Sequence, residues 1–231
     1  MALMWDPMYW VFAAPALILA LVAQWWVRHS YNKYLSVRNG SGMTGVEAAR
    51  HMMRGSGIGV TLEGAQGTLS DHYDPRSKTL RLSEEVANQP SVASVAIVAH
   101  ELGHAQQDAQ AYTPMRIRSG LVPVVNFTSW LGPILFIAGL WLSVRPIAWL
   151  GIIAFGAAAL FAVVTLPVEI NASQRGLRLL ERSGILTGQE EKKQARRVLS
   201  AAALTYVAAL AQAISTLLYY VFLLRGGRRR R

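Results

Sequence analysis

The chain has 231 residues and no cysteine, which excludes a disulfide framework and a thiolate metal site. Its hydrophobic fraction of 52% and charged fraction of 16% are shifted from the values of soluble domains toward those of membrane proteins. A net charge of +10 is compatible with nucleic acid or anionic lipid, but many of the arginines flank apolar segments, which favours the membrane.

Four segments are long and apolar enough to cross a bilayer, which takes about 20 residues. They run from about Tyr9 to Val27, Leu121 to Ser143, Pro146 to Val168 and Ala201 to Leu224. The first lacks a basic start and a clear cleavage site, so we expect a retained anchor rather than a signal peptide. The second and third are separated only by Ser143 to Pro146, which predicts a tight antiparallel hairpin.

The polar region between the first two spans contains short elements. Thr44 to Glu47 has a capping-box pattern, which predicts the start of a helix that continues through Arg54. A glycine-rich stretch follows, with a short strand expected at Ile58 to Leu62. Asp71 to Lys78 reads as a turn cluster, and the alternation in Thr79 to Ser83 predicts a half-buried strand.

A longer helix is expected from about Ser91 to Gln110. After the third span, Glu169 to Ser183 is expected to be helical, with Gly184 as its stop. A second capping box, Thr187 to Glu190, predicts the start of a basic helix that runs into the fourth span.

The helix from Ser91 to Gln110 contains the sequence HELGH, residues 100–104, which matches the pattern H-E-x-x-H. His100 and His104 are four residues apart, so on a helix both imidazoles project from one face and can supply two ligands of a tetrahedral Zn²⁺. Glu101 follows the first histidine and is placed to accept a proton from a metal-bound water. Gly103 leaves room for another segment to approach closely.

A catalytic zinc site needs a third protein ligand. The candidates in the polar regions are His29, His51, His72, Asp71, Asp74 and several glutamates. Connectivity narrows them, because the chain leaves the motif helix by the second span and returns by the third. Glu169 therefore emerges on the side of the motif, next to a long apolar run, where a carboxylate requires a partner. Zn²⁺ would be such a partner; the alternative is an interfacial glutamate paired with Arg175 or Arg178 on its own helix.

Three segments extend the motif to a family resemblance: HELGHAQQ (100–107), DHYDPRSKTLRLSEEV (71–86) and LPVEINASQRGL (166–177). With WDPMYW near the start and NKYLSVRNGSGMTGVEAAR after the first span, they resemble the YugP-like neutral zinc metallopeptidases of bacterial membranes. This family is similar in layout to the membrane-embedded Ste24-like and HtpX-like gluzincins. The resemblance implies His100, His104 and Glu169 as zinc ligands and Glu101 as the base.

The same resemblance leads us to expect an acidic residue where this chain has Asn171, which could have oriented a ligand histidine. Asp108 or Asp74 are alternatives for that role. His72 and Tyr73 could stabilise the oxyanion of the tetrahedral intermediate, or they could be ordinary turn residues.

Two other features near the motif each have two interpretations. Arg175 could hold a substrate carbonyl or a supporting carboxylate, or be a surface charge on its helix. The strand after the turn cluster could pair with an extended substrate, or form a plain hairpin.

These features predict a zinc-dependent endopeptidase with one Zn²⁺ per chain, a polypeptide substrate, a place in the lipid bilayer and no specific nucleic-acid partner. A non-catalytic metal-binding scaffold or adaptor is the alternative, and an intramembrane site-2-type protease is disfavoured because the apolar run before His100 is too short for a span. We expect the bacterial inner (cytoplasmic) membrane. The basic loop from Glu169 to Ser200 favours a cytoplasmic active site, although the arginine tail, Arg228 to Arg231, favours the opposite side.

The predicted fold class is a mainly α integral membrane protein with about four transmembrane helices and a small α+β, zincin-like catalytic domain at the membrane surface. The expected order is residues 1–28, the first transmembrane helix; 29–120, the catalytic α+β region; and 121–168, the transmembrane hairpin. Residues 169–200 follow as the third-ligand helix and the basic amphipathic helix, and 201–231 as the fourth transmembrane helix with its basic tail.

Overall fold

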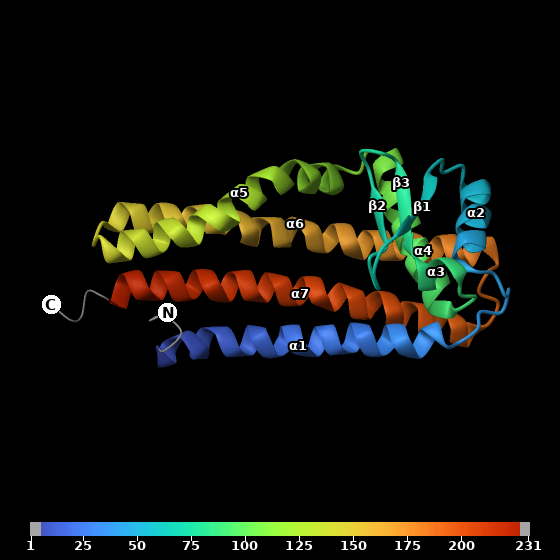
Figure 1. Cartoon of the computed structure of the whole chain (residues 1–231), viewed down its shortest axis with the longest axis horizontal. Helices are drawn as coiled ribbons and strands as arrows, with labels where there is room; N and C mark the ends of the chain where they lie inside the picture. Colours follow the sequence, from blue (N-terminus) through green and yellow to red (C-terminus); the bar gives the residue numbers. More distant parts are fainter. Residues whose placement is uncertain (1–5, 227–231) are drawn as a thin grey trace. The chain divides into compact units, whose positions relative to one another are not determined.

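The computed structural model describes residues 6–226, and this range is mainly helical with a small three-stranded sheet (Figure 1). The helices are α1 (Pro7–Leu35), α2 (Gly45–Ser56), α3 (Glu84–Asn88), α4 (Val92–Ala109), α5 (Thr113–Trp141), α6 (Arg145–Ser183) and α7 (Gln189–Gly226). The strands are β1 (Thr61–Ala65), β2 (His72–Asp74) and β3 (Thr79–Ser83). The arginine tail lies outside the described residues.

Four of the described helices, α1, α5, α6 and α7, are long and apolar enough to cross a membrane, which confirms the four predicted spans. Each helix has 29 or more residues, so each continues beyond the roughly 20 that a bilayer requires. Helix α6 joins the predicted third span and the predicted helix after it into one element, with Pro167 in its interior. Membrane helices tolerate such a proline where neighbouring groups satisfy the freed backbone carbonyl.

The chain divides into two compact units. The first comprises the chain up to Ala23, Ile117–Leu166 and the chain from Thr205 onward. In it Phe136 is fully buried and stacks on Tyr220 with ring centroids 4.0 Å apart. Helices α5 and α6 touch at Gly139, where a Cβ would lie 2.3 Å from the backbone nitrogen of Ala148. Large apolar side chains remain on the outside, among them Trp141 at 85% exposure, as a lipid-facing surface requires.

The second unit comprises Gln24–Arg116 and Pro167–Leu204. Its sheet has the order β1-β3-β2, with β1 parallel and β2 antiparallel to the central strand β3. Leu80 and Leu82 of β3 are buried with Val98 and Leu102 of α4, because both elements turn an apolar face to one core. Strand β2 contacts α4 and is an edge strand, so it borders the helix that carries the HELGH sequence (Figure 1).

Several local predictions are confirmed in this unit. Thr44 and Glu47 form the predicted capping box of α2, and both of its reciprocal hydrogen bonds are present. Strand β3 has the predicted bounds, but it is not half-buried as predicted, because it is the central strand and Thr79 and Ser83 are buried as well as Leu80 and Leu82. Helix α4 begins after Ser91, whose side chain accepts a hydrogen bond from the Ser94 backbone. Gly184 follows α6 with a φ of 68°, the left-handed conformation of a helix stop.

Three further local predictions are wrong. Strand β1 lies at Thr61–Ala65 rather than at Ile58 to Leu62, because its register is set by parallel pairing with β3. Within the predicted turn cluster, His72–Asp74 form strand β2 and only Pro75 to Lys78 turn, with the Asp74 carboxylate accepting bonds from Arg76 and Ser77.

The third concerns the start of α7. The carboxylate that accepts bonds from the Thr187 and Gly188 backbones belongs to Glu191 and not to Glu190.

Candidate metal centre

Helix α4 places both histidines of the HELGH sequence one turn apart, as their spacing predicts. Their ring centroids are 4.8 Å apart and the ring planes are nearly perpendicular. His104 is buried and His100 is partly buried. The helix can hold them rigidly because most of its remaining residues pack into the core of the second unit.

Helix α6 contributes Glu169, which is only 2% exposed. Its Oε2 atom lies 3.3 Å from Nε2 of His100 and 3.4 Å from Nε2 of His104. One ligand atom from each of the three residues lies within 4.8 Å of the others, so the set could hold a metal ion. The candidate ligand set is thus two histidines from α4 and one glutamate from α6, which is one of the sets seen in catalytic zinc sites.

Two glycines permit the close contact between α4 and α6 that brings these ligands together. A Cβ on Gly103 would lie 2.3 Å from the carbonyl oxygen of Ala172, and a Cβ on Gly176 would lie 2.7 Å from that of Ala99. No real Cβ contact is that short, so each position needs a residue without a side chain. The space that Gly103 was expected to leave is filled by α6.

The outer ring nitrogens of both histidines are engaged by side chains of the same two helices. Nδ1 of His100 lies 3.1 Å from the Ser173 hydroxyl, and Nδ1 of His104 lies 3.0 Å from Oε1 of Gln107. Both inner nitrogens therefore face Glu169. This is the arrangement of metal-binding histidines, which bind the ion through one nitrogen while a neighbouring group holds the other.

The charge of Glu169 also fits a metal ligand. Burial acts to raise its pKa, but contacts with His100 and His104 outweigh burial and lower the pKa well below the usual carboxyl range. A metal-binding carboxylate must be ionised, and a lowered pKa is the direction that such a ligand needs. On charge, ligand type and proximity the three residues fit a Zn²⁺ ion.

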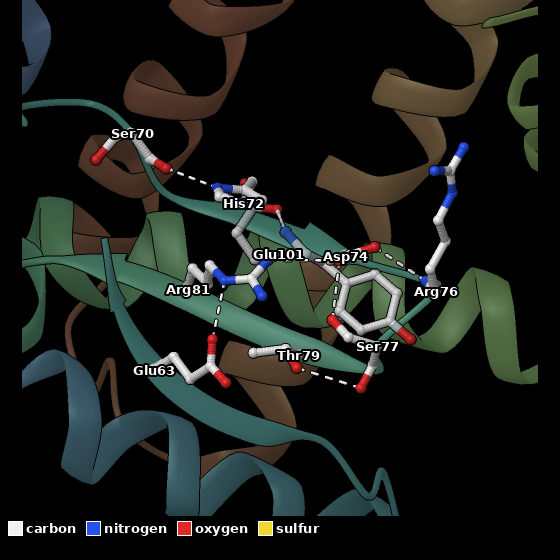
Figure 2. A network of polar contacts seen from close by, with 10 residues as sticks. Glu63, Ser70, His72, Asp74, Arg76, Ser77, Thr79, Arg81 and Glu101 are labelled. Atoms are coloured by element: carbon white, nitrogen blue, oxygen red, sulfur yellow. Dashed lines mark hydrogen bonds and ion pairs between the residues drawn. The ribbon is translucent and has the colours of Figure 1, made fainter. Parts of the chain in front are cut away.

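Glu101 is buried beside this cluster and is held by the edge strand. Its Oε2 accepts a hydrogen bond of 2.9 Å from the backbone nitrogen of Tyr73 in β2, and Figure 2 shows Glu101 beside that strand. Burial raises the pKa of Glu101, although His100 and His104 act in the opposite direction. A carboxylate with a raised pKa holds a proton more readily, which suits a group that accepts a proton and later donates it.

The remaining candidate residues lie around the cluster but not in it. The exposed ring of His72 contacts the Ser70 carbonyl, and Asp74 contacts Arg76 and Ser77 in the turn and Arg81 in β3 (Figure 2). The phenol of Tyr73 donates a hydrogen bond of 2.6 Å to Asp108, and burial together with this bond raises its pKa.

Asn171 and Arg175 contact each other at 2.7 Å, and Asn171 also accepts a bond from Gln107 rather than from a histidine. The residues that do contact the histidines, Ser173 and Gln107, were missed. Their spacing could have revealed them, since Ser173 lies one helical turn after Glu169 and Gln107 lies three residues after His104.

The sequence matches the protein family described as "Putative neutral zinc metallopeptidase" over residues 9–225. It is also 42% identical over 214 residues to a Bacillus subtilis (strain 168) protein described as "Putative membrane protease YugP". That alignment covers 92% of this chain and 95% of the relative. No solved structure matches the chain.

Proposed function

The chain belongs to this family of neutral zinc metallopeptidases, and we propose that it is a membrane endopeptidase that depends on Zn²⁺ held by His100, His104 and Glu169. The observation that carries the proposal is the contact of one buried carboxylate with both histidines of the motif. An H-E-x-x-H pattern supplies two ligands, and a gluzincin-like site needs a glutamate from a later helix as the third. Glu169, which lies 65 positions after His104, is placed to be that glutamate. The substrate is a polypeptide.

A Zn²⁺ ion held by His100, His104 and Glu169 would supply Lewis-acid chemistry, lowering the pKa of a bound water to about 7 and polarising a peptide carbonyl. The chain supplies the proton transfers. Glu101 accepts the proton of the attacking water at its carboxylate and delivers it to the leaving amine. The Tyr73 backbone N–H holds one carboxylate oxygen of Glu101 in place, which leaves the other oxygen for this transfer.

An intramembrane protease and a non-catalytic scaffold are the two alternative functions for the same residues. A site inside a membrane span would require the motif helix to be one of the spans, but α4 is not among the four candidate spans found in residues 6–226. A non-catalytic scaffold would use the three ligands without needing a base. The burial of Glu101 beside the ligands favours catalysis over a scaffold, because burying a carboxylate there costs free energy.

The substitution Glu101→Gln separates these functions. It keeps the size of the side chain and its contact with the Tyr73 backbone, but it removes the proton acceptor. We expect the purified variant to keep its zinc and to hydrolyse a casein-like substrate about 10²- to 10⁴-fold more slowly than wild type, the range typical of a lost general base. A variant that cleaves as fast as wild type would contradict the mechanism, and wild-type protein that binds zinc without cleaving peptides would support the scaffold.

A further inference from the structure

Gln107 is a fully buried polar residue whose amide contacts three groups around the candidate metal centre. Its Oε1 lies 3.0 Å from Nδ1 of His104. Its Nε2 lies 2.8 Å from the backbone carbonyl oxygen of Val168 and 3.0 Å from Oδ1 of Asn171. A buried amide with every contact made is rigid, because any rotation would leave a polar group unsatisfied.

The orientation of this amide follows from what its neighbours can do. A backbone carbonyl can only accept, so the Val168 oxygen requires the NH₂ group of Gln107 to face it. The oxygen of Gln107 must then face His104. Because that oxygen can only accept, Nδ1 of His104 must carry the hydrogen.

Arg175 fixes the same orientation independently. Its guanidinium can only donate, and its Nε lies 2.7 Å from Oδ1 of Asn171, so the oxygen of Asn171 is the atom that faces Gln107. Arg175 is itself held by Gln110, at 2.6 Å, and lies over the ring of Tyr112. Arg175 can only donate and the Val168 carbonyl can only accept, so the amides of Asn171 and Gln107 between them can adopt one orientation.

We infer that Gln107 is a positioning residue that fixes the tautomer of His104 with its lone pair on Nε2, aimed at the metal position, and that Arg175 and Asn171 hold Gln107 in that role. The inference rests on the proposed zinc site. It assigns to an amide the role that carboxylates often fill beside metal-binding histidines. His100 differs, because the Ser173 hydroxyl can donate or accept and so leaves its tautomer free.

Zinc affinity of the full chain in detergent, measured by competition with a chromophoric chelator, tests the inference. We expect Gln107→Met, which has a similar shape but no hydrogen-bonding amide, to bind Zn²⁺ about 10- to 100-fold more weakly than wild type. Gln107→Glu keeps an acceptor for His104 but loses the donors to Val168 and Asn171, so we expect it to bind Zn²⁺ more tightly than Gln107→Met and less tightly than wild type. A role in structure alone would weaken both variants together.

The matched control is Gln106→Met on the same helix, because no histidine contacts the Gln106 amide and its long 3.4 Å contact with Arg175 is backed by the 2.6 Å contact of Gln110. We expect it to bind zinc as wild type does. Wild-type affinity in Gln107→Met, or equal weakness in Gln107→Met and Gln107→Glu, would overturn the inference.

A second variant covers the case in which Gln107→Met does not fold. Asn171→Asp keeps the oxygen that Arg175 and Gln107 share, so we expect zinc binding within about threefold of wild type, and a tenfold loss would overturn the inference. The measured quantity is zinc affinity and not peptide cleavage. If the variants differ in zinc affinity as expected but wild type cleaves no peptide, the proposed function is contradicted and the role of Gln107 is not. Wild-type protein without zinc binding contradicts both.

Discussion

Tyr73 shows how one residue on the edge strand can serve the candidate site through its backbone while its side chain serves the fold. Its N–H donates to Glu101, whereas its phenol donates to Asp108 near the end of α4. Lys78 pairs with the same carboxylate, so β2 and the turn after it are tied to α4 at Glu101, inside the motif, and at Asp108, one turn after it. This arrangement argues against the phenol as an oxyanion donor, since its hydrogen is already committed.

The substitution Tyr73→Phe tests that division of roles. We expect kcat to stay within about threefold of wild type, because the backbone N–H remains. The free energy of unfolding should fall by about 1.5 kcal/mol, since a hydrogen bond to a charged group is lost. Chemical denaturation and steady-state kinetics of the same preparation measure both quantities. A 100-fold loss of kcat with unchanged stability would instead assign the phenol to the transition state.

At the scale of elements, the site depends on how closely α4 and α6 approach each other. Gly103 and Gly176 set that distance, and the candidate ligands come from both helices: His100 and His104 from α4, Glu169 from α6. Any side chain that separates the helices must also move the carboxylate away from the histidines. Stability and metal binding should therefore change together at these glycines.

We expect Gly103→Ala to lower the free energy of unfolding by about 1–3 kcal/mol, because its methyl group meets the Ala172 carbonyl and the helices must move apart. Gly55→Ala is the matched control. A Cβ at Gly55 in α2 meets nothing within 4 Å, so there we expect a gain of about 0.5–1 kcal/mol from reduced chain entropy. Equal effects of the two substitutions on denaturant unfolding would contradict the packing argument.

Patterns within single elements were predictable, and arrangements that depend on two elements were less so. The spacing of His100 and His104 and the capping box at Thr44 are local, and the structure has both. Glu169 could be anticipated because span order restricts where the chain returns. The start of β1 and the contacts of Gln107 depend on pairing and on helix packing, which periodicity does not encode.

For the molecule as a whole, we propose that the candidate site faces the cytoplasm. Short loops on the cytoplasmic side of a membrane carry an excess of basic residues, and the segment between the third and fourth spans has such an excess. That segment carries Arg175, Arg178, Arg182, Lys192, Lys193, Arg196 and Arg197. By contrast, the turn between α5 and α6 has a single basic residue beside it, Arg145.

Single cysteines test this orientation directly, because the chain has none of its own. Ser77→Cys places a thiol in the exposed turn after β2, and Val144→Cys places one in the exposed turn between α5 and α6. In intact cells we expect a membrane-impermeant thiol reagent to label Val144→Cys, and to label Ser77→Cys only after permeabilisation. The reverse pattern would place the site on the outer side.

The zinc content of the purified chain tests most directly whether α4 and α6 together hold one zinc ion. Elemental analysis should find about one zinc per chain in wild type and in Glu101→Gln, where all three ligands remain. Glu169→Ala should lose nearly all of it, because two histidines alone bind zinc weakly. A full equivalent of zinc in Glu169→Ala would contradict a zinc site shared by the two helices.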